Sequence, residues 1–206
     1  MKLKICGLKY TDNIKDVAKF TPDYMGFIFY QDSKRFVGEE FDPVFLNSLD
    51  LKIKKVGVFV NSTKDHILKN VKKYQLDFVQ LHGDETSGYC NELCHDVKII
   101  KAFGVDETFD FSQLQDFKTS ASYFLFDTKT SEYGGSGKQF DWNILEKYDN
   151  EIPFFLSGGI DLENIEKILH LKNINIHAID ANSKFEIEQG LKDIRKIKLL
   201  KNAIHR

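Results

Sequence analysis

Two residues with acid–base chemistry stand at the ends of short apolar runs. Cys6 ends the run 3–6, and Asp127 follows the run 123–126. A thiol and a carboxyl group that face each other across a pocket suit general acid–base catalysis, in which one donates a proton and the other removes one. Because only the thiolate acts as a base, this interpretation requires a cation or hydrogen-bond donors that lower the pKa of Cys6. The alternatives are a core cysteine and an ordinary polar turn.

Other polar residues follow apolar runs in the same way. Arg35, in the loop Ser-Lys-Arg-Phe, could bind a carboxylate or phosphate bidentately, or could be a solvated surface residue. His82, in Gln-Leu-His-Gly, could bind a ligand or cap the next helix. It could also pair with Cys6 in nucleophilic catalysis, but no oxyanion-hole motif supports that role. Gly158 and Gly159 follow the run 153–156 and precede a helical pattern, which is typical of a phosphate-binding loop.

The elements that would position these residues alternate regularly along the chain. Apolar runs typical of buried strands lie at residues 3–6, 24–29, 54–60, 78–81, 98–103, 123–126, 153–156 and 175–179, and helical patterns follow them. Such a pattern predicts a parallel sheet covered by helices. Eight units in 206 residues predict a single-domain (β/α)8 TIM barrel that spans residues 1–206, with its site at the carboxyl ends of the strands. Thr11, Ser62 and Asp161 are the expected helix N-caps, Ser62 with Asp65 in a capping box.

Composition limits the possible partners and location. The 29 basic and 31 acidic residues nearly balance, so nothing favours nucleic acid or a membrane surface, and no apolar run reaches the length of a membrane span. The apolar residues Ile187, Leu191, Ile194 and Ile197 fall at helical spacing, so the basic stretch 192–201 is interpreted as the solvated face of the last helix. Three cysteines and no apolar leader suggest free thiols in the cytoplasm. Cys90 and Cys94, four residues apart beside His95, are expected to pack in a helix and not to bind metal, so no metal site is predicted.

Several motifs together resemble those of the phosphoribosylanthranilate isomerase family of tryptophan biosynthesis. They are Lys-Ile-Cys-Gly at 4–7, Gly-Phe-Ile-Phe-Tyr at 26–30, Ser-Lys-Arg-Phe at 33–36, Val-Gly-Val-Phe-Val-Asn at 56–61, Val-Gln-Leu-His-Gly at 79–83, Phe-Asp-Thr-Lys-Thr at 126–130, Tyr-Gly-Gly-Ser-Gly-Lys at 133–138, Phe-Asp-Trp at 140–142 and Leu-Ser-Gly-Gly at 156–159. The resemblance covers nearly the whole chain in the family's order. It implies an Amadori rearrangement of N-(5-phosphoribosyl)anthranilate that needs no cofactor.

The resemblance also implies roles for individual residues. Asp127 would be the general acid and Cys6 the general base. Arg35 would bind the anthranilate carboxylate, Gly158 and Gly159 the phosphate, and Asp180 would have a supporting polar role in the pocket. One stretch departs from the family pattern, because Lys184 stands where many members have glycine. Since a residue with a Cβ tolerates positive φ poorly, the loop could run differently. We expect the phosphate to meet Asn182 and Ser183 there, or the charge of Lys184.

The glycine-rich loop 133–138 is long for a connection between a strand and a helix, and we expect it to act as a mobile lid. The alternatives to the isomerase are another phosphosugar barrel, such as an epimerase or the next synthase of the pathway, and a barrel that binds phosphorylated ligands without catalysis. The pair Cys6 and Asp127 argues against both. A second substrate with two phosphates is not expected from one phosphate loop. A monomer and a homodimer are both compatible with the sequence.

Overall fold

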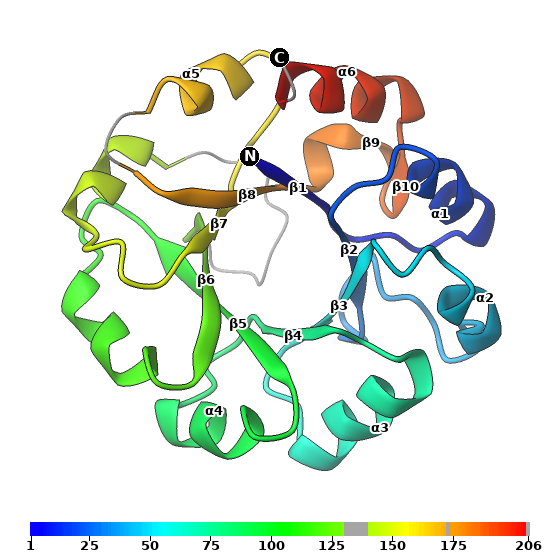
Figure 1. Ribbon diagram of the computed structural model, residues 1–206, viewed down its shortest axis with the longest axis horizontal. Coiled ribbons are helices and arrows are strands. Elements are labelled where there is room, and N and C mark those ends of the chain that lie inside the picture. Colours follow the sequence, from blue (N-terminus) through cyan, green and yellow to red (C-terminus); the bar gives the residue numbers. More distant parts are fainter. Residues whose placement is uncertain (130–139, 172–173, 205–206) are drawn as a thin grey trace.

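Eight parallel strands close into a barrel, as the sequence predicts (Figure 1). The computed structural model describes residues 1–129, 140–171 and 174–204. The strands are β1 (Lys2–Ile5), β2 (Tyr24–Ile28), β3 (Lys54–Phe59), β4 (Phe78–Leu81), β5 (Lys98–Val105), β6 (Ala121–Thr128), β7 (Phe154–Leu156) and β8 (Ile176–Ala181). Each pairs with the next, and β8 closes the barrel by pairing with β1, with Lys4 opposite Asp180.

Alternation along the strands divides their side chains between two cores. Residues that point into the barrel form an inner cluster, which includes Tyr24, Phe78 and Phe155. Their neighbours in sequence, such as Met25 and Val79, point outward and pack under the helices. Both faces of each strand are therefore covered, which explains why the strands appear in the sequence as continuous apolar runs. Inward positions near the carboxyl ends are free to carry polar groups.

A ring of helices surrounds the barrel (Figure 1). The α-helices are α1 (Thr11–Ala18), α2 (Pro43–Asn47), α3 (Lys64–Tyr74), α4 (Ser87–Leu93), α5 (Ile165–Leu169) and α6 (Ile194–Ile204). The units after β5 and β6 contain the 3-10 helices η1 (Phe111–Phe117) and η2 (Trp142–Lys147) instead of longer α-helices. Cys90 is buried within α4, as expected, and Cys94 lies at the C-cap of that helix.

The three predicted helix caps differ from the observed ones. Thr11 is the first residue of α1 and not its cap. Thr63, not Ser62, caps α3 by accepting a hydrogen bond from the backbone N–H of His66. Asp161 accepts hydrogen bonds from two backbone N–H groups of a turn, and α5 begins only at Ile165. Neighbouring Ser, Thr and Asp residues have similar capping propensities, so only the backbone path decides which of them reaches an N–H group.

The segment after β8 corrects another prediction. It forms a short 3-10 helix, η3 (Ser183–Phe185), and a hairpin of β9 (Glu186–Glu188) and β10 (Leu191–Lys192). The last helix therefore begins at Ile194, and Ile187, which was assigned to its apolar face, is exposed on β9. Lys192 is fully buried, whereas the sequence places it on a solvated face. The helical spacing of 187, 191, 194 and 197 arises by chance across a hairpin.

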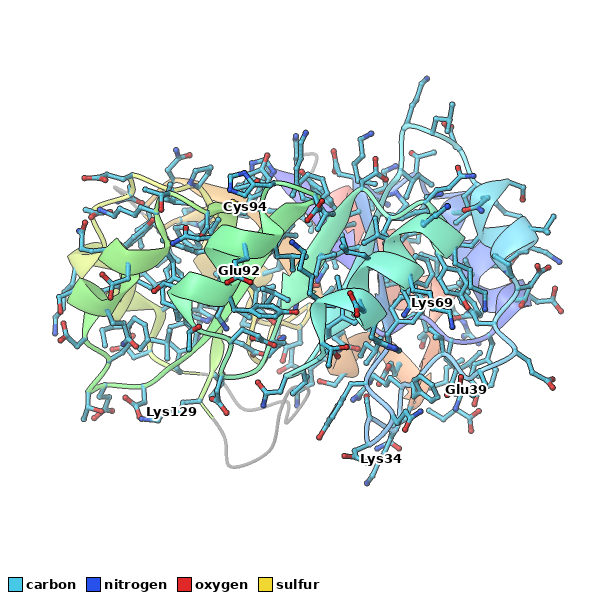
Figure 2. The ribbon with its side chains drawn as sticks, turned by 90° about the horizontal axis from the view of Figure 1, so that it is seen from below. Lys34, Glu39, Lys69, Glu92, Cys94 and Lys129 are labelled. Atoms are coloured by element: carbon cyan, nitrogen blue, oxygen red, sulfur yellow. The ribbon has the colours of Figure 1, made fainter. Side chains whose placement is uncertain are left out.

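The two ends of the barrel carry different parts of the chain. Lys34 and Lys129, which follow β2 and β6, lie toward one end of the molecule, and Cys94 lies toward the opposite end (Figure 2). The first end is that of the strand carboxyl termini. The predicted lid, residues 133–138, lies outside the described residues. Within the residues that are described, no helix is long and apolar enough to cross a membrane.

Candidate active site

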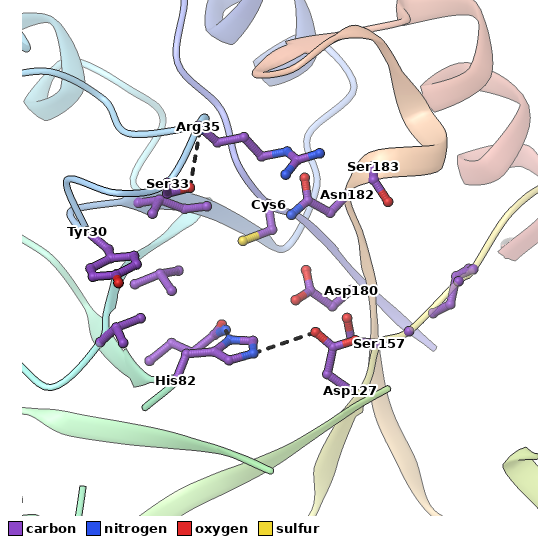
Figure 3. Close-up of a pocket in the computed structure, with 17 residues that line it drawn as sticks. Cys6, Tyr30, Ser33, Arg35, His82, Asp127, Ser157, Asp180, Asn182 and Ser183 are labelled. Atoms are coloured by element: carbon purple, nitrogen blue, oxygen red, sulfur yellow. Dashed lines mark hydrogen bonds and ion pairs between the residues drawn. The ribbon is translucent and has the colours of Figure 1, made fainter. Parts of the chain in front are cut away.

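A pocket of about 750 Å³, partly open to solvent, lies at the carboxyl ends of the strands. Every site residue predicted from the sequence lines it: Cys6, Arg35, His82, Asp127, Gly158, Gly159, Asp180, Asn182 and Ser183. Tyr30, Ser33, Gln80 and Ser157 are among the other lining residues. Arg35, Asn182 and Ser183 gather on one side, His82 and Asp127 lie on another, and Cys6 and Asp180 lie between them (Figure 3).

Cys6 follows β1 and points into the pocket from a tightly packed position. A Cβ atom at Gly26 would lie 2.6 Å from the Cys6 sulfur, so the neighbouring strand needs glycine there. Burial raises the pKa of the Cys6 thiol, although the nearby Lys4 and Lys192 ammonium groups partly offset the effect. The cations that a thiolate base requires are therefore present, but in the ligand-free protein burial outweighs them.

Asp127 lies near the end of β6, and its side chain is largely buried, with 14% of its surface exposed. Burial raises the pKa of its carboxyl group to about 6, and the hydrogen bond that Oδ1 accepts from the Thr128 backbone N–H, at 2.8 Å, limits that rise. The nearby Asp180 carboxylate also favours the protonated form. A carboxyl group with a pKa close to neutrality is suited to donating a proton.

His82 follows β4 and faces Asp127, with its Nε2 3.6 Å from Oδ2 of the carboxyl group. Its other ring nitrogen, Nδ1, lies 2.7 Å from the side-chain nitrogen of Gln80. Burial lowers the pKa of His82 to about 3, and the Lys4 and Lys101 cations lower it further. The imidazole is therefore neutral at physiological pH.

Below the pocket lies a buried ion pair whose lysine the sequence analysis did not identify. The Lys4 ammonium group, with no exposed surface, donates hydrogen bonds to Oδ2 of Asp180 at 2.8 Å and to the side-chain oxygen of Gln80 at 2.6 Å. Among the described residues, Oδ1 of Asp180 is buried without a hydrogen-bond partner. Lys4 could have been found, because it stands two residues before Cys6 and so shares its face of the strand.

Arg35 reaches the pocket from the loop after β2 and is held by an acid that the sequence analysis also missed. Its guanidinium donates from Nε and Nη2 to both carboxylate oxygens of Glu186, at 2.7 to 3.1 Å. Lys192 donates to the same carboxylate at 2.8 Å and to Oδ1 of Asn182 at 2.8 Å. Glu186 and Lys192 come from the hairpin strands β9 and β10, so no local pattern pointed to them.

Two backbone segments could hold a phosphate, one after β7 and one after β8. Gly158 and Gly159 have φ values of +87° and +68°, a conformation that favours glycine. Asn182 and Ser183, after the neighbouring strand β8, also line the pocket, whereas Lys184 is exposed on η3 and does not line it. Lys184 is not among the described residues with positive φ, so a glycine is not required at this position. No group of three potential metal ligands occurs in the described part of the chain.

The family model of N-(5'phosphoribosyl)anthranilate (PRA) isomerase matches residues 3–203 of this chain. An N-(5'-phosphoribosyl)anthranilate isomerase of Parabacteroides distasonis is 45% identical over 200 residues, which cover 96% of this chain and 90% of that protein. The crystal structure of phosphoribosyl anthranilate isomerase from Thermotoga maritima superimposes with a TM-score of 0.90 at 34% identity and full coverage of both chains.

Another solved isomerase of this name holds reduced 1-(o-carboxyphenylamino)-1-deoxyribulose 5-phosphate. It superimposes with a TM-score of 0.84 at 29% identity, again with full coverage of both chains. Both structural relatives share the closed barrel described above, and the family match extends over the strands that carry every lining residue of the pocket. By its sequence and by its fold, the chain belongs to the N-(5'-phosphoribosyl)anthranilate isomerase family.

Proposed function

We propose that residues 1–206 form one catalytic domain that performs the isomerisation of tryptophan biosynthesis, with Asp127 as general acid and Cys6 as general base. The substrate is N-(5-phosphoribosyl)anthranilate, and the product is 1-(2-carboxyphenylamino)-1-deoxyribulose 5-phosphate. The observation that carries this assignment is the convergence of a buried thiol and a carboxyl group on one pocket that also contains Arg35 and the glycine pair. The reaction uses no metal and no organic cofactor, because the Schiff base forms within the substrate.

The first step assigned to the protein is opening of the furanose ring. Asp127 donates its proton to the ring oxygen, the bond from that oxygen to C1 breaks, and the substrate nitrogen forms an iminium with C1. With a pKa of about 6, roughly one Asp127 in ten is protonated at pH 7. The neutral His82 beside it adds no positive charge that would oppose protonation.

The second step is proton removal from C2 of the sugar, which the iminium makes acidic. Cys6 as thiolate takes this proton, and the resulting enaminol tautomerises to the ketone. Because burial raises the pKa of Cys6 above that of Asp127, the productive form, with a thiolate and a protonated carboxyl, is a minor species of the free enzyme. After each turnover the proton gained by Cys6 leaves through solvent and Asp127 regains one, so the enzyme returns to its starting state.

The two ends of the substrate carry anions, and the pocket offers a site for each. Glu186 holds Arg35 through Nε and Nη2, and the remaining N–H groups of the guanidinium are assigned to the substrate carboxylate. Gly158 and Gly159 follow β7, and Asn182 and Ser183 follow the neighbouring strand β8, so these four residues form the proposed phosphate site. His82 and Asp180 are assigned to contacts with the sugar.

We also propose a cytoplasmic enzyme that acts as a monomer or a homodimer. Cys6, Cys90 and Cys94 are all free thiols, and a thiol base must remain reduced to function. Among solved relatives, the isomerase of Thermotoga maritima is described as dimeric, and a structure exists of monomers generated from it.

The decisive assay follows the loss of fluorescence of freshly prepared phosphoribosylanthranilate. We expect turnover by the wild-type chain, and we expect Asp127→Asn and Cys6→Ser each to lower kcat by more than about a hundredfold, the scale of acid–base groups. Cys94→Ser and Asp106→Asn, both outside the pocket, serve as matched controls and should retain normal kcat. A wild-type chain without turnover contradicts the function. Near-normal kcat in the two pocket variants contradicts the mechanism.

A further inference from the structure

A buried chain of polar side chains runs beneath the pocket from Asp180 to Asp127. Lys4 donates to Oδ2 of Asp180 and to the side-chain oxygen of Gln80, and the side-chain nitrogen of Gln80 lies 2.7 Å from Nδ1 of His82. His82 then faces Asp127 across 3.6 Å (Figure 3). Lys4 has no exposed surface and does not line the pocket, and Gln80 is 1% exposed. The chain therefore joins a group below the pocket to the proposed proton donor.

The chemistry of the end groups determines the direction of every hydrogen bond in this chain. A lysine ammonium group can only donate, so the Gln80 oxygen must face Lys4. The Gln80 amide nitrogen then faces His82, and since this nitrogen also only donates, Nδ1 of His82 must accept. A neutral imidazole with an acceptor Nδ1 carries its proton on Nε2. The Nε2–H group therefore points at Asp127.

The charged groups around His82 keep it neutral. Lys4 on β1 and Lys101 on the outward face of β5 are the nearby cations, and both act with burial to hold the pKa of His82 at about 3. Asp127 faces it from β6. Lys101 is itself tied to Glu85 at 3.0 Å and to the Gly83 carbonyl at 2.8 Å, in the loop that follows His82. Strands β1 and β5 thus carry the two cations that act on the ring, and β6 carries the proposed acid.

We propose that Gln80 is a positioning residue for the isomerisation, which with Lys4 holds His82 in the neutral tautomer whose Nε2–H faces Asp127. The proposal deepens the function given above, because it takes Asp127 as the proton donor. A His82 that can only donate toward Asp127 cannot accept its proton, so the carboxyl proton remains available for the ring oxygen of the substrate. After the transfer, the same N–H group can donate a hydrogen bond to the carboxylate that forms.

The opposite tautomer would act against catalysis. Its Nε2 would present a lone pair to Asp127 and accept a hydrogen bond from the protonated carboxyl group. The imidazole would then compete with the substrate for the catalytic proton. A positioning residue that excludes this tautomer should affect kcat more than KM, because the ground-state contacts of the substrate are unchanged.

The first test needs no substrate. Long-range proton–nitrogen NMR of the 15N-labelled wild-type protein reports which ring nitrogen of each histidine carries the proton, and the His82 signals are identified by their loss in His82→Gln. We expect a protonated Nε2 and an unprotonated Nδ1, unchanged between pH 5 and pH 8. A proton on Nδ1, or an imidazolium at pH 6, overturns the proposal.

The second test reverses the tautomer. In Gln80→Glu, a carboxylate of nearly the same shape accepts from both Lys4 and an Nδ1–H of His82, which moves the imidazole lone pair to Nε2. We expect kcat to fall by about tenfold or more with KM changed less than about threefold. Gln80→Met, which removes the hydrogen bonds without adding a charge, should give a mixture of tautomers and a smaller loss.

A double-mutant cycle separates this effect from a structural one. In a His82→Gln background, Gln80→Glu should cause little further loss of kcat, because no tautomer remains to be reversed. Wild-type kcat in a Gln80→Glu protein with the reversed tautomer refutes the catalytic role. An unreversed tautomer refutes the role of Gln80 in holding it. If the wild-type chain does not turn over phosphoribosylanthranilate, the proposed function fails, and the NMR result still decides the tautomer.

Discussion

Asp127→Asn should lower the activity strongly and at the same time stabilise the fold. The Asp127 side chain is 14% exposed, and its pKa is raised to about 6 because burial disfavours the carboxylate. In the unfolded chain an aspartate has a pKa of about 3.9. Above that pH the Asp127 carboxyl group ionises more readily in the unfolded chain than in the folded one, so it lowers the free energy of unfolding increasingly as the pH rises toward 6. Asparagine removes this ionisation and can still accept the hydrogen bond from Thr128.

The size of the effect follows from the two pKa values. A difference of about two units, at about 1.4 kcal/mol for each, gives a stabilisation of about 3 kcal/mol at pH 7.5. The gain should shrink to about 1.5 kcal/mol at pH 5 and to about 0.5 kcal/mol at pH 4, where Asp127 is protonated in the folded state and about half ionised in the unfolded state. Urea unfolding of both proteins at these three pH values measures the free energy of unfolding directly.

A matched control has the opposite sign. Asp106 accepts hydrogen bonds from Lys129 and Thr108, which lower its pKa to about 2. Its carboxylate therefore favours folding above the pKa of the unfolded chain, and this contribution is lost as the pH falls toward 2. Asp106→Asn should destabilise the fold slightly at neutral pH. If Asp127→Asn is no more stable than the wild type at pH 7.5, or if its gain persists at pH 4, the interpretation of Asp127 as a desolvated acid is refuted.

Two further predictions concern the buried charges and the pH dependence. Lys4→Met should lower the free energy of unfolding by about 3–5 kcal/mol, because it leaves the buried Asp180 carboxylate unpaired. In urea unfolding, the double variant Lys4→Met/Asp180→Asn should recover much of this loss. A double variant as unstable as Lys4→Met would contradict the pairing. The pH profile of kcat/KM should be bell-shaped, rising through a pKa of about 6 for Asp127 and falling above the raised pKa of Cys6, because the productive form needs the opposite protonation of the two groups. Asp127→Asn should remove the limb near pH 6 from its residual rate, and a limb that persists there would assign it to another group.

Much of the architecture could be predicted because it depends on local, repeated patterns. The eight strands were recognisable as continuous apolar runs, since each is covered on both faces. Helix caps were less predictable, as Thr63 in place of Ser62 shows, because adjacent hydroxyl residues differ only in the path of the backbone. The hairpin after β8 was mistaken for helix, because its apolar residues happen to repeat at helical spacing over 187–197.

The residues of the candidate site were likewise predictable only where they follow a local pattern. Cys6, His82, Asp127 and the glycine pair follow strands in the sequence, and parallel strands in a barrel bring their carboxyl ends to one place. Glu186 and Lys192 could not be found in this manner, because their role depends on a hairpin that returns to Arg35 from 151 residues further along the chain. The pKa of Cys6 was likewise undecided, because burial and two cations oppose each other there.

By itself, the sequence of this protein determined the barrel, the family and the set of groups that meet at the mouth, since strand order and strand ends are properties of the chain. Tertiary structure alone decided how those groups are charged and oriented. Lys4 lies beneath the pocket because β8 closes against β1 and places Asp180 opposite it. Through Gln80 that cation directs the proton of His82, and its field reaches Cys6 and Asp127. Desolvation and charge act through space, so they appear only when distant strands have come together.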